Sequence, residues 1–112
     1  MKSFGHTIRQ MRIDKGLLLR QLAAKLNVDS SLLSRVENGA KKLSREQVVA
    51  LASILGEDEA KLLVLYLGER VVYELKDEEA LAIEAIMVAE KRIRYNARNT
   101  KDESQGRDEK NQ

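Results

Sequence analysis

Apolar residues recur every three or four positions through most of the chain. Between residues 18 and 26, for example, Leu19, Leu22, Ala23 and Leu26 fall on one side of a helix. Spacing of this kind predicts amphipathic helices. The predicted helices span residues 3–15, 18–26, 30–38, 45–55, 58–75 and 78–95. We therefore expect an all-α protein.

Short local patterns mark where these helices begin and end. Gly16 follows the first helix as a C-terminal cap, and Asn27 tolerates the left-handed backbone that a sharp turn needs. Asp29 is expected to cap the helix that follows, because its carboxylate accepts from free backbone N–H groups. Ser44 with Gln47 fits a capping box, which places the start of the fourth helix at residue 45.

The C-terminal part has a less regular pattern. The run KLLVLYL at 61–67 is apolar almost all round, which implies burial on more than one side. Its helix either continues to about Leu75 or breaks at Gly68, because VVYEL also has β-branched and aromatic content. Asp77 is expected to cap the last helix. Residues 98–112 are polar and aperiodic, so we expect a disordered tail.

Composition excludes several kinds of functional site. Apolar residues make up 43% of the 112 residues but aromatic residues only 4%, so the core must be aliphatic. Cysteine is absent, which excludes disulfides, thiolate metal ligands and cysteine nucleophiles. Ser3 and His6 lie one helical turn apart, but neither a second histidine nor an oxyanion-hole glycine cluster accompanies them. We expect no enzymatic activity, no metal and no cofactor.

Neither a membrane span nor a signal peptide is evident. The longest apolar run, LLVLYL at 62–67, is far shorter than the ~20 residues that a spanning helix needs. The first residues, MKSFGHTIRQM, lack the apolar stretch of a signal peptide. We therefore expect a cytoplasmic protein with no membrane contact.

Charge is divided unevenly between the two halves of the chain. Residues 1–56 carry ten Lys and Arg against four acids, a net charge of +6, whereas residues 57–112 carry ten against fourteen, a net charge of −4. A basic first half indicates an anionic partner at that end. The alternative is a solvated surface whose charge is merely uneven.

Two short helices joined by a tight turn, 18–26 and 30–38, match the helix-turn-helix pattern. The run QLAAKLNVDSSLLSRVENGAKKLSREQVVALASILG at 21–56 resembles the Cro/cI-type (XRE-family) helix-turn-helix regulators. The resemblance extends over about residues 4–66. It implies a lambda-repressor-like five-helix DNA-binding domain at 1–67, a bacterial or phage origin, and double-stranded DNA as the partner. Leu19 departs from the family pattern, which often has a phosphate-binding Gln or Thr at that position.

The resemblance also assigns the residues that contact DNA. The helix 30–38 is expected to enter the major groove, where arginine pairs with guanine and serine donates or accepts. The expected base contacts are Ser30, Ser31 and Arg35. The expected phosphate contacts are Ser34, Asn38, Lys41, Lys42 and Arg45, with Arg9, Arg12 and Arg20 as further candidates. No small-molecule ligand is implied.

Structural roles remain open for several of these residues. The two serines could be ordinary first-turn residues, Arg35 could pair with Asp14 or Glu37, and the lysines could belong to a solubilising loop. Glu37 is expected to be structural, since a carboxylate near phosphates would repel them.

The back half carries more aliphatic surface than four helices can cover. We expect an extension at 68–97 that mediates a homodimer. The candidate interface residues are Leu63, Leu67, Val71, Ile83, Ile86 and Met87. In the alternative, these helices only complete a monomeric core.

Together these features predict a sequence-specific transcriptional regulator. The favoured form is a repressor or operon controller, which could also regulate its own gene. The alternatives are an antitoxin that binds operator DNA and a toxin, and a nucleoid protein without sequence preference.

Overall fold

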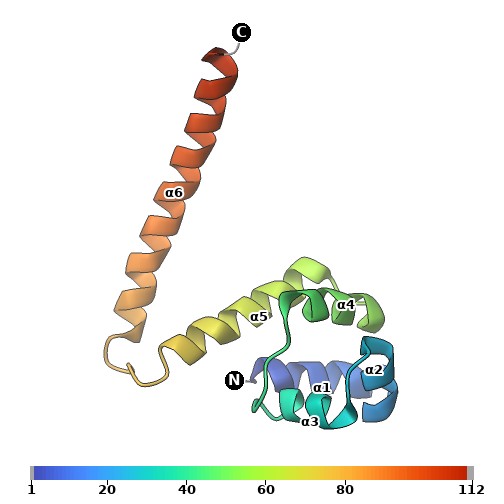
Figure 1. Ribbon diagram of the computed structural model, residues 1–112. Coiled ribbons are helices and arrows are strands. Elements are labelled where there is room, and N and C mark those ends of the chain that lie inside the picture. The colour runs from blue at the N-terminus through green and yellow to red at the C-terminus, as the bar shows by residue number, and fades with distance from the viewer. Residues whose placement is uncertain (1, 111–112) are drawn as a thin grey trace. The chain divides into compact units, whose positions relative to one another are not determined.

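The computed structural model describes the backbone of residues 2–110 and the side chains of residues 2–100. All of the regular elements in this part of the chain are helices, as predicted (Figure 1). They are α1 (Phe4–Asp14), α2 (Leu19–Leu26), α3 (Ser30–Glu37), α4 (Arg45–Leu55), α5 (Glu59–Glu74) and α6 (Ala82–Lys110). The chain divides into two compact units, Met1–Glu74 and Leu75–Gln112.

The first unit packs α1 to α5 around one aliphatic core. Each of the five helices contributes fully buried side chains, and the largest are Ile8, Leu22, Leu33, Val48, Leu51, Leu55 and Leu62. Phe4 and Tyr66 supply the aromatic part of this core, with ring centroids 5.7 Å apart in an edge-to-face arrangement. The Tyr66 hydroxyl donates to the carbonyl oxygen of Leu43 at 2.9 Å, so the buried phenol is satisfied.

Most of the helix boundaries follow the local patterns in the sequence. Asn27 takes the left-handed conformation, with φ 60° and ψ 44°, and reverses the chain between α2 and α3. The capping box before α4 is formed: the Gln47 amide donates to Ser44 Oγ at 3.2 Å, and the Ser44 amide donates to Gln47 Oε1 at 2.8 Å. Asp29 occupies the N-cap position of α3, but its side chain makes no capping hydrogen bond.

The C-terminal helices differ from the sequence prediction in their limits. Helix α5 continues through Gly68 to Glu74, so the first unit ends seven residues later than the predicted boundary at 67. The last helix begins at Ala82, because the residues before it form turns. In these turns the Glu78 amide donates to the carbonyl oxygen of Leu75, and the Leu81 amide donates to that of Glu78, both at 3.0 Å. Asp77 is therefore not its cap.

The predicted disordered tail is replaced by helix over most of its length. Helix α6 runs to Lys110, and only residues 111–112 of the tail lie outside the described backbone. A polar sequence without a period shows that the segment has no apolar face for packing. It can still be helical, because extending an existing helix costs far less free energy than nucleating a new one. No proline interrupts the segment. No helix within residues 2–110 is long and apolar enough to cross a membrane.

One residue that was expected at a dimer interface is instead buried in the core. Leu63 is only 9% exposed and belongs to the aliphatic core, together with Leu62 and Tyr66 of the same helix. The sequence pattern did not separate Leu63 from Leu67, because the run at 61–67 is apolar on every side. The other expected interface residues are exposed: Leu67, Val71, Ile83, Ile86 and Met87.

Helices α1 and α3 cross at close range beside Gly5. A Cβ atom built on Gly5 would lie 2.2 Å from the carbonyl oxygen of Val36 and 2.8 Å from that of Glu37. Both obstacles are backbone atoms near the C-terminal end of α3, so no side-chain rotation relieves the clash. Glycine is therefore required at this position for α3 to lie on α1.

We expect Gly5→Ala to lower the free energy of unfolding by about 1–3 kcal/mol, the usual cost of overpacking. Urea denaturation followed by circular dichroism measures the change. His6→Ala, an exposed position on the same helical turn, is the matched control and should leave stability within about 0.5 kcal/mol of wild type. Equal midpoints for the two variants would contradict the close crossing.

Candidate nucleic-acid interface

Helices α2 and α3 form a compact pair joined by the turn at Asn27. The Val28 amide donates to the carbonyl oxygen of Ala23 at 3.0 Å, which closes the C-terminal end of α2. Ala23, with its small side chain, is 1% exposed and belongs to the core. On α3, Leu33 and Val36 are 0% and 2% exposed and anchor one side of the helix in the core.

The other side of α3 is polar and accessible. Ser30, Ser31 and Arg35 are exposed, and Ser34 is half-buried on the flank. Ser31 and Arg35 are four residues apart, so their side chains lie one above the other on the same helical face. Ser31 and Arg35 therefore share one accessible face, and Ser30, about 140° from Arg35 around the helix, is exposed at its edge.

Both acids that could have paired with Arg35 are engaged elsewhere. Asp14 accepts from Gln10 Nε2 at 2.9 Å, and Glu37 is held by Arg12. The structural role that the sequence left open for Arg35, an ion pair with Asp14 or Glu37, does not occur.

A buried ion pair ties α3 to α1. Arg12 Nε donates to Glu37 Oε2 at 2.8 Å, and Arg12 Nη2 donates to Glu37 Oε1 at 3.1 Å. Arg12 Nη1 donates to the carbonyl oxygen of Leu17 at 2.9 Å, in the loop between α1 and α2. The two side chains are only 12% and 5% exposed. Arg12 was a candidate for phosphate binding. This was wrong, because its guanidinium donates to Glu37 and Leu17 within the first unit. The structural role expected for Glu37 is confirmed.

The loop after α3 and the first residue of α4 carry the cations expected to bind phosphate. Asn38, Lys41, Lys42 and Arg45 are all exposed, while Leu43 between them is 3% exposed and fastens the loop to the core. The Ala40 amide donates to the carbonyl oxygen of Arg35 at 2.8 Å, which keeps the start of the loop against the end of α3.

Lys42 is set apart from the other cations of this loop. Its Nζ lies 3.6 Å from the centroid of the Tyr73 ring on α5, a cation–π contact. Lys42 also borders a shallow hollow with Leu67, Arg70, Val71, Tyr73 and Glu74. Sequence reasoning missed this contact, because nothing in the local pattern relates positions 42 and 73.

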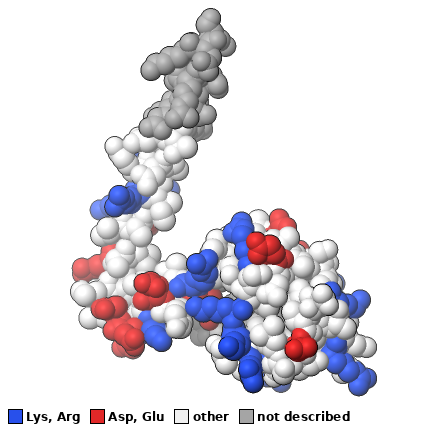
Figure 2. Space-filling view, viewed as in Figure 1, with Lys and Arg blue, Asp and Glu red and all other residues white. Residues whose placement is uncertain are grey.

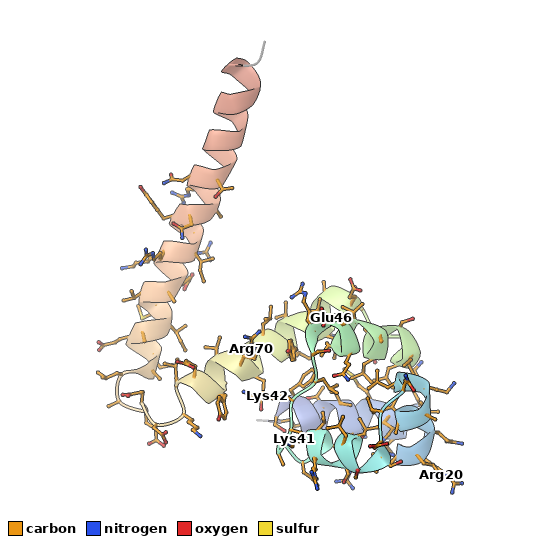
Figure 3. The ribbon with its side chains drawn as sticks, viewed as in Figure 1. Arg20, Lys41, Lys42, Glu46 and Arg70 are labelled. Carbon is orange, nitrogen blue, oxygen red and sulfur yellow. The ribbon has the colours of Figure 1, made fainter. Side chains whose placement is uncertain are left out.

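Basic side chains predominate over acidic ones on the face of the first unit drawn in Figure 2. Figure 3 places Arg20 at the α2 end of this unit and Lys41 at the opposite end, beyond the C-terminus of α3. Both are exposed. Positive charge therefore flanks α3 at both ends, although the net charge of the whole chain is only +2. Leu19, in contrast, is half-buried and packs against the core.

Comparisons with known proteins agree with this geometry. A family model described as a helix-turn-helix domain matches residues 3–65, which is more than half of the chain. The chain belongs to the helix-turn-helix domain family. This confirms the resemblance carried by residues 21–56. No curated protein matches the chain.

Two crystal structures of the clp gene regulator ClgR from Corynebacterium glutamicum are similar to this helix-turn-helix protein. One is 35% identical, with a TM-score of 0.51, and the alignment covers 58% of this chain and 84% of that chain. The other is 31% identical, with a TM-score of 0.52, and covers 72% of this chain and 86% of that chain. The predicted all-α fold of five helices with an added C-terminal helix is confirmed.

We expect Arg12→Met to lower the free energy of unfolding by about 3–5 kcal/mol, because it leaves the buried Glu37 carboxylate without a partner. The double variant Arg12→Met/Glu37→Leu should lose less than Arg12→Met alone, since no uncompensated charge remains. Urea denaturation of the double-mutant cycle measures the coupling. Arg9→Met, an exposed arginine on the same helix, is the control. A double variant less stable than Arg12→Met would contradict the view that the unpaired Glu37 carboxylate causes the loss of stability.

Proposed function

We propose that this protein is a sequence-specific transcriptional regulator that binds double-stranded DNA as a homodimer, with α3 in the major groove. One observation carries the proposal: α3 is two-sided, with Leu33 and Val36 in the core and Ser31 and Arg35 on the accessible side. Membership of the helix-turn-helix domain family supports a DNA-binding regulator. The similarity to ClgR, itself a gene regulator, supports a role in transcription.

In this proposal, Arg35 contributes most to the specificity for a DNA sequence. Its guanidinium presents paired N–H donors that match O6 and N7 of guanine, a contact worth about 1–3 kcal/mol of discrimination against other bases. Ser30 and Ser31 precede it on the accessible side of α3. A hydroxyl both donates and accepts, so the serines supply weaker contacts, some of them through water.

Phosphate contacts position the helix in the groove. Asn38, Lys41 and Arg45 are exposed in and after the loop that follows α3, and Ser34 lies on the flank of the helix. Lys42 adds its charge at the same edge while it lies on the Tyr73 ring. These groups carry no sequence information, and they raise the affinity for any duplex.

A homodimer doubles the few contacts that one recognition helix makes. Half-sites one DNA turn apart, roughly 34 Å, require two α3 helices related by a two-fold axis. Exposed apolar residues for such an association are present on both α5 and α6: Leu67, Val71, Ile83, Ile86 and Met87. We propose that the dimer represses, by occupying promoter DNA that RNA polymerase would otherwise bind, and that its own promoter is among its targets.

Fluorescence anisotropy on DNA from the region upstream of the gene tests sequence-specific binding. We expect wild type to bind this duplex at least about 100-fold more tightly than a shuffled duplex. Arg35→Ala should weaken binding to the upstream duplex by about 30-fold or more, because the dimer loses one bidentate contact at each of its two half-sites, and should change binding to the shuffled duplex far less.

Arg98→Ala removes the same charge from an exposed position on α6 and serves as the control, with no expected change in the ratio of the two affinities. Equal affinity of wild type for the two duplexes would contradict sequence-specific recognition. An unchanged ratio in Arg35→Ala would contradict the role of Arg35.

Lys41→Ala is expected to weaken binding to both duplexes by a similar factor, because it removes a phosphate contact. The slope of log affinity against log salt concentration should become shallower by about 1.8, because each copy in the dimer loses one phosphate contact. Titrations at four salt concentrations measure the slope, with Lys91→Ala on α6 as the control. A slope equal to that of wild type would exclude Lys41 from the phosphate contacts.

A further inference from the structure

One side of α5 faces the loop between α3 and α4. The Tyr66 hydroxyl donates to the carbonyl oxygen of Leu43 at 2.9 Å. The centroid of the Tyr73 ring lies 3.6 Å from Nζ of Lys42 in the same loop. Tyr66 and Tyr73 are seven residues apart, so their side chains project from α5 within about 20° of each other. The two contacts define the side of the helix that lies along the loop.

Arg70 projects from this side of α5, between the two tyrosines. It follows Tyr66 by four residues and precedes Tyr73 by three, so it lies about 40° and 60° from them around the helix. Arg70 is exposed, and it lines the same shallow hollow as Lys42. Helical geometry and the shared hollow therefore agree that Arg70 stands beside the loop that carries the proposed phosphate contacts.

Arg70 continues the positive charge of the loop onto α5. In Figure 3, Lys42 lies between Lys41 and Arg70, and all three side chains are exposed. Among the residues whose side chains are described, Arg70 makes no ion pair. Its guanidinium is therefore open to an external anion, in contrast to the buried guanidinium of Arg12.

We propose that Arg70 binds a backbone phosphate of the DNA duplex, next to the phosphates bound by Lys41 and Lys42. The inference rests on the proposed DNA binding, and it adds α5 to the elements that contact the duplex. Tyr73 is a positioning residue of this site, because its ring holds the Lys42 ammonium on the α5 side of the loop. A DNA strand bound at Lys42 then passes the rim of the hollow where Arg70 stands.

The chemistry of the hollow favours a phosphate at its Arg70 end. A planar guanidinium donates two parallel hydrogen bonds to phosphate oxygens, and Lys42 supplies a second positive charge beside it. Glu74 lines the same hollow, four residues after Arg70 and about 6 Å further along the helix axis. Its carboxylate repels a phosphate bound nearby, so Glu74 limits the affinity of the site.

Fluorescence anisotropy of the full chain on the shuffled duplex, at four salt concentrations, tests the inference. We expect Arg70→Ala to weaken binding by about 2- to 30-fold, the loss of one surface ion pair in each copy of a dimer. The slope of log affinity against log salt concentration should become shallower by about 0.9 for each copy bound. Arg70→Lys retains the charge and should retain the wild-type slope. Lys61→Ala, an exposed position 180° from Arg70 around α5, is the matched control.

Glu74→Gln gives an effect of the opposite sign on the same surface. Removing the carboxylate should strengthen binding to the shuffled duplex by about 2-fold or more, because repulsion between like charges is similar in size to attraction between opposite ones. Unchanged affinity in this variant would overturn the placement of a phosphate at the hollow.

The outcomes separate the inference from the proposed function. A wild type that binds neither the upstream nor the shuffled duplex overturns DNA binding and the Arg70 contact together. Wild-type binding with an unchanged slope in Arg70→Ala overturns only the Arg70 contact, and leaves this surface to an acidic protein segment. Equal losses in Arg70→Ala and Lys61→Ala also overturn it, because the effect is then one of overall charge. A slope that Arg70→Lys does not restore contradicts a contact made through charge.

Discussion

The ion pair between Arg12 and Glu37 joins the three segments on which the position of α3 depends. One guanidinium holds the carboxylate near the C-terminus of α3, and its remaining donor binds the carbonyl oxygen of Leu17 in the loop before α2. The Glu37 side chain is 5% exposed and the Arg12 side chain 12%, so breaking the pair would leave a buried carboxylate without its partner. The pair therefore fixes α3 against α1 and fixes the start of α2 at the same time.

Close backbone packing reinforces the same junction. The absence of a side chain at Gly5 lets α1 lie directly against the carbonyl groups of Val36 and Glu37. Leu33 and Val36 then fill the core from the inner side of α3. With its inner side anchored at several points, α3 presents Ser31 and Arg35 from a rigid backbone. Base recognition requires such rigidity, since hydrogen bonds to base edges weaken steeply when distance and angle are lost.

The cations around α3 and most of the exposed apolar residues lie on different helices. The first unit holds α3 and the cations around it, in the half of the sequence with a net charge of +6. Apolar surface that this unit leaves exposed gathers on the outer side of α5, and α6 in the second unit carries more of it. Exposed apolar patches of this kind mark association surfaces. The proposed binding to an anionic duplex and the proposed association between copies therefore use different surfaces.

Much of the fold and the accessible side of α3 could be predicted from the sequence, because both depend on local chemistry. Gly16, Asn27 and the Ser44–Gln47 box set helix boundaries through bonds within a few residues, and the 3.6-residue period separates Leu33 from Arg35. Partners distant in sequence could not be predicted. Arg12 and Glu37 are 25 positions apart, and Lys42 and Tyr73 are 31 apart. Both pairs exist only because the helices pack.

The sequence by itself therefore determined the first four helices, which side of each of them is apolar, and which residues α3 presents, but not the extent of α6. The tertiary structure decided that Arg12 serves the core, that Leu63 is buried while Leu67 is exposed, and that Gly5 is required while Gly68 has open space around it. The physical reason is the range of the forces. Capping and periodicity act within one or two turns of helix, whereas burial, ion pairing and steric exclusion depend on which distant segment lies against a side chain.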